Sequence, residues 1–291
     1  MKVSILSMLC MGLTALVSFA IPPVLCIWLR KKKRADLLPF FIGMAVFFLF
    51  ALVLESLMHQ LVLNSEVGKA IQGNTWLYAL YGGLAAGVFE ETGRFVAFKT
   101  VLKKYQTRDV NALMYGAGHG GCEAALLLGG TMISNLVLSV MLNSGMEGTI
   151  TGSLQGEQLA QMEEVFRTLC TTSPPSWFLG LAERFFAVAL HIALTVPVWF
   201  AAKDARHWCL YPVAILLHFL VDAVTVVLSR AGLSTLALEG VLACMSAAVV
   251  LFAWLLWKKY RAEPAAEAPA PVAEESASTA EDRADPPSAA E

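Results

Sequence analysis

Charged residues are scarce in this sequence: Asp, Glu, Lys and Arg make up only 15% of its 291 residues. Hydrophobic residues make up 57%, and the mean hydropathy is +0.63. Soluble globular domains have about 25% charged residues, so this composition excludes an ordinary soluble protein. We therefore expect residues 1–260 to form an all-α, polytopic bundle of about seven transmembrane helices.

The sequence also lacks CxxC spacings and internal repeats. Its six cysteines lie mostly within or beside the apolar runs, which excludes a disulfide framework. Apolar runs are missing after residue 260, where the chain ends in PAAEAPAPVAEESASTAEDRADPPSAAE. Residues 261–291 are therefore predicted to be a disordered, acidic, Ala/Pro/Glu-rich tail.

Hydropathy predicts seven spans, near residues 4–29, 37–63, 75–102, 110–143, 177–202, 209–228 and 233–257. The fourth is long and glycine-rich, so we expect a break within it. Basic residues gather on alternate connections: Arg30 to Arg34, Lys103 with Lys104 and Arg108, Lys203 with Arg206, and Lys258 with Lys259 and Arg261. The positive-inside rule then predicts an outside N-terminus and a cytoplasmic tail.

The longest connection, residues 144–176, is then outside. Within it, EQLAQMEEVFRTL (157–169) is predicted to form an amphipathic helix at the membrane surface.

Ionisable residues lie at a similar depth inside four of the predicted spans. At ~1.5 Å per residue, four of them lie ~14–17 Å from the cytoplasmic ends of their spans: Glu91, His119, His191 and His218. Such residues cost about 2.5–3.5 kcal/mol each near a helix centre, so a shared depth indicates a site. Interhelical hydrogen bonding alone is the alternative.

The spacing of ionisable residues along each helix also supports a site at this depth. Arg94 falls between Glu90 and Glu91 around its helix and can pair with either. His119 and Glu123 are spaced i, i+4, as are His218 and Asp222. Each pair could bind one metal, or the carboxylate could orient the imidazole.

A second charged layer is predicted nearer the outside. Glu55 and Arg184 both lie ~27 Å from the cytoplasmic side, with Glu183 just beyond, and we expect Glu55 and Arg184 to form a structural ion pair.

The order EETGR (90–94), GAGHGGCE (116–123) and HFLVD (218–222) resembles the YhfC-type membrane peptidases, within the superfamily of CAAX proteases and bacteriocin-processing enzymes. The resemblance covers residues 75–228 and includes the stretch from Glu183 to His191. CAAX proteases have EExxxR, one residue longer than the motif here. PrsW-type relatives have a lysine in place of Arg94 and a phenylalanine in place of His119.

The resemblance implies a glutamate-dependent, metal-assisted intramembrane endopeptidase. Glu90 or Glu91 would be the general base, beside Arg94. His119 and His218 would bind a divalent metal, with zinc the first choice. His191 and Glu123 are candidate third ligands, and Asp222 would orient His218.

Substrates would be membrane proteins or lipopeptides that enter from the bilayer, in the plasma membrane of a bacterium. Nothing indicates nucleic acid, and the sequence carries no sign of an oligomeric state. Two rivals stay open: a non-catalytic scaffold of the same fold, and a proton-coupled transporter, against which the missing inverted repeat argues.

Overall fold

The computed structural model describes residues 2–261, and the predicted acidic tail lies outside this part except for Arg261. The described residues contain helices and no strand. Six helical segments are long and apolar enough to cross a membrane: Ile5–Lys33, Leu38–Leu63, Val110–Asn143, Pro174–Lys203, Ala205–Arg230 and Thr235–Tyr260. The chain is therefore an integral membrane protein whose surface contacts the lipid bilayer.

The seventh long helix is α5, Thr75–Lys99, which carries Glu90, Glu91 and Arg94. Its 25 residues span ~37 Å at ~1.5 Å per residue, enough to cross the hydrocarbon core. With it, the polytopic helical bundle of about seven spans is confirmed.

The other long helices are α1 Ile5–Lys33, α10 Leu179–Lys203, α11 Leu210–Arg230 and α12 Thr235–Tyr260. Two spans are composite: α2 Leu38–Val46, η1 Phe47–Glu55 and α3 Ser56–Leu63 form one, and α6 Val110–Glu123, η3 Ala124–Gly129 and α7 Gly130–Asn143 form the other. Both η1 and η3 are π-helical. The fourth span thus changes its winding at 124–129 instead of breaking.

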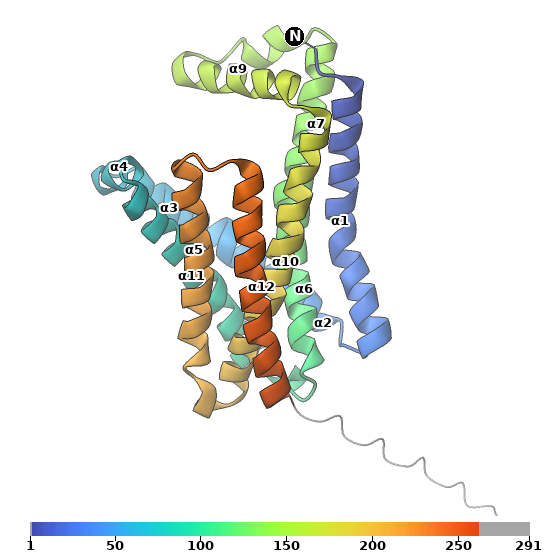
Figure 1. The fold of residues 1–291 in the computed structure, drawn as a ribbon, viewed down its shortest axis with the longest axis vertical. Coiled ribbons are helices and arrows are strands. Elements are labelled where there is room, and N and C mark those ends of the chain that lie inside the picture. Colours follow the sequence, from blue (N-terminus) through green and yellow to red (C-terminus); the bar gives the residue numbers. More distant parts are fainter. Residues whose placement is uncertain (1, 262–291) are drawn as a thin grey trace, which may run out of the picture. The chain divides into compact units, whose positions relative to one another are not determined.

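Short helices occupy the connections: α4 Glu66–Gly73, α8 Glu147–Thr151 and α9 Gly156–Thr171, with 3-10 turns η2 Lys103–Tyr105, η4 Pro174–Phe178 and η5 Ala205–His207. The predicted amphipathic helix is α9, which lies across the end of α7 in Figure 1. Its Phe166 and Leu169 are buried against residues of α1 and α7.

Helix α10 is the centre of the bundle. In the most apolar 18-residue stretch of the span that contains α10, 78% of the residues are buried. The corresponding stretches of the other five apolar spans are 22–39% buried. It packs on α6, α12, α11 and α5, and Figure 1 shows it (yellow) among them. A residue on α10 can therefore face several helices at one depth.

Close helix approach supports this packing. A Cβ on Gly118 of α6 would lie 2.0 Å from the Phe40 carbonyl oxygen of α2, and one on Gly87 of α5 would lie 2.8 Å from the Ile215 oxygen of α11. These neighbours can pack backbone to backbone only because glycine is present.

Candidate active site

Helix α5 buries two adjacent carboxylates and a guanidinium. Glu91 and Arg94 are fully buried, and Glu90 is 7% exposed. Arg94 Nη1 donates to both oxygens of Glu91, each at 2.7 Å. This charge-assisted pairing offsets part of the cost of burying both charges.

Glu90 turns to other helices. Its Oε2 atom lies 2.8 Å from His119 Nε2 on α6 and 3.6 Å from His191 Nδ1 on α10. The two glutamates, adjacent in sequence, therefore have separate partners.

The partners of His191 assign its tautomer. Arg94 Nη2 lies 3.4 Å from Nδ1, and because a guanidinium only donates, Nδ1 is the acceptor. The ring hydrogen then sits on Nε2, which lies 2.5 Å from Glu123 Oε2. Glu123 thus contacts the Nε2 side of His191, while Arg94 and Glu90 both lie on its Nδ1 side.

His218 on α11 is held from the other side. Its Nδ1 atom lies 2.8 Å from Glu91 Oε1, and its Nε2 atom lies 3.5 Å from Asp222 Oδ2. The Asp222 side chain is 36% exposed, against 4% for His218. Asp222 therefore has the most exposed side chain among the four carboxylates predicted for the site, Glu90, Glu91, Glu123 and Asp222.

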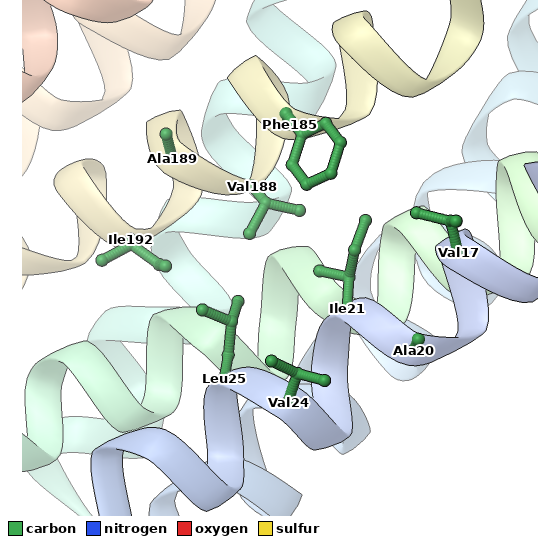
Figure 2. Close-up of a pocket in the computed structure, with 9 residues that line it drawn as sticks. All are labelled: Val17, Ala20, Ile21, Val24, Leu25, Phe185, Val188, Ala189 and Ile192. Atoms are coloured by element: carbon green, nitrogen blue, oxygen red, sulfur yellow. The ribbon is translucent and has the colours of Figure 1, made fainter. Parts of the chain in front are cut away.

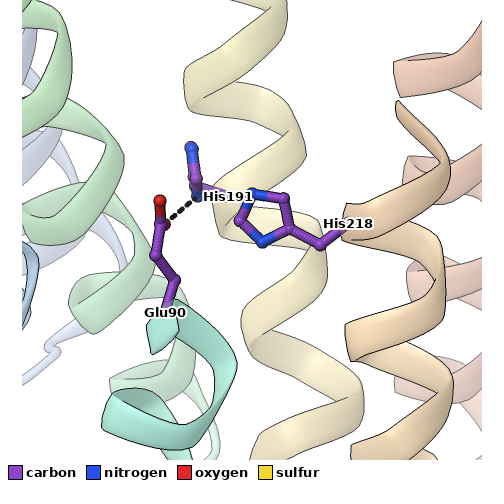
Figure 3. Close-up of side chains that lie close together, drawn as sticks. All are labelled: Glu90, His191 and His218. Atoms are coloured by element: carbon purple, nitrogen blue, oxygen red, sulfur yellow. Dashed lines mark ion pairs between the residues drawn. The ribbon is translucent and has the colours of Figure 1, made fainter. Parts of the chain in front are cut away.

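One set of donors has the spacing of a metal site. Ligand atoms of Glu90, His191 and His218 all lie within 4.8 Å of one another, and Figure 3 shows the three side chains converging from α5, α10 and α11. Two imidazoles and one carboxylate are a known donor set of catalytic zinc, which leaves a fourth position open. By donor type and spacing, these three residues therefore fit a divalent cation.

All eight residues predicted for the site are connected through these contacts. His119 and Glu123, expected as ligands, lie beside the set: His119 contacts Glu90, and Glu123 contacts His191. Glu90, expected as a base, lies within it.

The predicted outer ion pair is wrong. Glu55 Oε1 contacts His59 Nε2 at 3.2 Å, and His59 Nδ1 contacts the Tyr81 hydroxyl at 2.9 Å. Arg184 Nη1 instead donates to Glu123 Oε1 at 2.6 Å, and Arg184 also contacts Glu183.

Through Glu123, Arg184 is thus connected to the eight residues predicted for the site. The sequence did not predict this connection. The spacing of seven residues between Arg184 and His191, two helical turns, was the available signal.

Comparison with known protein families gives one match that covers most of the chain. The model of the family described as "YhfC intramembrane metalloprotease" matches residues 17–243. The chain belongs to the YhfC family.

A curated YhfC relative, "Uncharacterized membrane protein YhfC" of Bacillus subtilis (strain 168), is 34% identical over 256 residues. The match covers 86% of this chain and 95% of the relative. No solved structure matches. The YhfC match includes all four helices that carry the cluster.

Proposed function

We propose that this protein is an intramembrane metallopeptidase that hydrolyses peptide bonds in membrane proteins or lipopeptides. The observation that carries the proposal is the convergence of Glu90, His191 and His218 inside the helical bundle. The family description agrees with it.

In this proposal Glu90, His191 and His218 hold a divalent cation, with zinc favoured by the donor set. Such an ion would supply Lewis-acid activation of water and of the scissile carbonyl. Glu123 keeps the ring hydrogen of His191 on Nε2 and so presents Nδ1. His119 holds the Glu90 carboxylate through its 2.8 Å contact.

Glu91 is a positioning residue. Arg94 and His218 already occupy its oxygens, and it is fully buried. Glu90 is thus the member of the pair at the reacting centre. Asp222 lies 3.5 Å from His218 Nε2 and has the more exposed side chain of the two.

The proposal keeps the predicted setting: a bacterial plasma membrane, an outside N-terminus and a cytoplasmic tail. Substrates enter from the bilayer.

The test compares Glu90→Gln and Glu91→Gln in full-length protein, with the exposed Glu66→Gln as the control. Because Glu90 is a proposed ligand, Glu90→Gln is expected to lose bound metal and turnover together while the protein stays folded. Glu91→Gln leaves a buried guanidinium without its carboxylate, which costs on the order of 3–5 kcal/mol of stability.

Turnover is read from membrane-protein fragments in cells that carry each variant, and metal content from the purified proteins. Loss of metal together with turnover in Glu90→Gln assigns Glu90 as a ligand, and loss of turnover alone assigns it as the base. Wild-type fragments in Glu90→Gln cells would sink the peptidase proposal in favour of a scaffold. Lost solute uptake with unchanged fragments would indicate a transporter.

A further inference from the structure

A polar cavity lies at the ends of α10 and α12, away from the candidate active site. Its volume is about 550 Å³, and its polar lining includes Lys203, Asp204, Arg206, His207 and Lys259. Both helices end here, at Lys203 and Tyr260, so the cavity lies where the bundle leaves the membrane.

Among the described residues that line it, the cavity carries surplus positive charge. Lys203 is paired with Asp109 at 2.6 Å, and Arg206 with Asp204 at 2.6 Å. Hydrogen bonds from Arg206 hold the pKa of Asp204 at about 2, so that pair stays ionised and neutral overall at ordinary pH. Lys259 adds a charge whose contact in the described chain is the Tyr260 ring, 5.0 Å from Nζ.

An apolar groove of about 400 Å³ runs along the same two helices. Its walls include Ala189, Ile192 and Val196 of α10 and Val250 and Trp257 of α12. The cavity and the groove meet at aromatic rings, since Phe200 of the cavity lies 6.3 Å from Trp257 between ring centroids.

The groove crosses the inner part of one leaflet and extends past the bilayer midplane. Counted along α10 at ~1.5 Å per residue, Val196 lies ~10 Å and Ala189 ~21 Å from Lys203. Half of a ~30 Å hydrocarbon core is ~15 Å, so an acyl chain attached at the interface would reach the part of the groove nearer to Lys203.

A tryptophan that lines the groove lies next to a lysine in the last turn of α12. Lys258 Nζ lies 3.7 Å from the ring centroid of Trp254, which lines the groove. Tryptophan next to lysine is typical of the membrane interface, where the ring faces lipid and the ammonium faces head groups.

We propose that a phospholipid with an anionic head group binds along α10 and α12, with its phosphate in the polar cavity and one acyl chain in the apolar groove. A lipid supplies both chemistries at the required spacing. A soluble phosphate would use the cavity alone and would leave the groove unexplained.

A second apolar groove serves as an internal comparison. It lies between α1 and α10, and Figure 2 shows side chains of both helices facing the same space. It shares Ala189 and Ile192 with the first groove but extends to Phe185, farther from Lys203 along α10. It is not part of the proposed lipid site.

The test titrates purified full-length protein with phosphatidylglycerol, phosphatidylcholine or glycerol phosphate and follows the melting temperature. Phosphatidylglycerol is expected to raise it more than phosphatidylcholine, and glycerol phosphate to leave it unchanged. Lys259→Gln and Arg206→Gln are each expected to raise the half-maximal phosphatidylglycerol concentration about fivefold, and Lys259→Arg to leave it near wild type. The charge control is Lys103→Gln, an exposed lysine on another connection.

The acyl-chain half of the site is tested by filling the groove. Val250→Trp is expected to weaken the phosphatidylglycerol effect, whereas Val24→Trp in the other groove leaves it unchanged; both positions are exposed, at 40% and 61%. Equal stabilisation by both lipids would overturn the proposal. The proposal would also be overturned if phosphatidylglycerol stabilised the Lys259→Gln and Arg206→Gln variants as well as it stabilises the wild type. That result is expected if the acidic tail fills the cavity.

Discussion

Glu90 and Glu91 show how one helix serves two purposes. Consecutive helical residues point ~100° apart, so one glutamate faces α6 and α10 while the next faces α11. The second is held by Arg94 and His218, and the first reaches the imidazoles of His119 and His191. In the proposed function, Glu91 therefore positions its neighbours and Glu90 takes part in the chemistry.

Glu123 offers a prediction at this scale. Glu123→Gln is expected to lower divalent-metal affinity ~10–100-fold, because an amide holds the Nε2 hydrogen of His191 less strongly than a carboxylate. Metal titration of the purified protein measures the effect. Glu183→Gln is the matched control, since Glu183 also contacts Arg184 but has no contact with His191 in the described structure. Equal affinities in the two variants would show that Glu123 does not orient the ring.

Counting residues along the predicted spans showed which ionisable residues share a depth, but not which of them contact one another. A residue's height in its span follows from counting, whereas its direction depends on how neighbouring helices rotate and pack. Glu55 and Arg184 have similar heights but belong to different clusters, with His59 and with Glu123. Within α5 a single helix fixes both the height and the direction of each side chain. The sequence therefore limited the ion-pair partner of Arg94 to Glu90 or Glu91, and the structure shows that it is Glu91.

At the scale of elements, the contact between α2 and α6 holds the cluster's first histidine in place. A Cβ on Gly43 would lie 2.3 Å from the Tyr115 carbonyl oxygen, and one on Gly118 would lie 2.0 Å from that of Phe40. His119 follows Gly118 directly, so the backbone that carries it is fixed by this contact.

Gly118→Ala is therefore expected to destabilise the protein by ~1–3 kcal/mol, because backbone atoms cannot move aside as a flexible side chain can. Gly82→Ala is the control: a Cβ there meets nothing within 4 Å, and alanine favours the helix by up to ~1 kcal/mol. Thermal unfolding in detergent compares them. A Gly118→Ala variant as stable as Gly82→Ala would contradict the close contact.

Hydropathy predicted the long helices because apolar length is a property of sequence alone. The third span was predicted at 75–102, and α5 ends at Lys99. The π-helical turns were not predicted, since they depend on tertiary packing and leave no change in composition.

At the scale of the whole molecule, membrane orientation stays a prediction from the basic residues. With cysteines introduced at exposed positions, Glu163→Cys on α9 should react with an impermeant reagent in intact cells. Lys103→Cys should react only after lysis, because the positive-inside rule places that connection in the cytoplasm. The reverse pattern would invert the orientation.

The π-helical turns have a consequence for how this family changes in length. A π turn holds one more residue per hydrogen-bonded ring than an α turn, so it resembles a single-residue insertion tolerated within a helix. A deletion within 124–129 could be absorbed by a return to α winding, with His119 and Glu123 unmoved. The same deletion between His119 and Glu123 would rotate one against the other by ~100°. Gaps in alignments of homologues are therefore expected at 47–55 and 124–129, and not within GHGGCE.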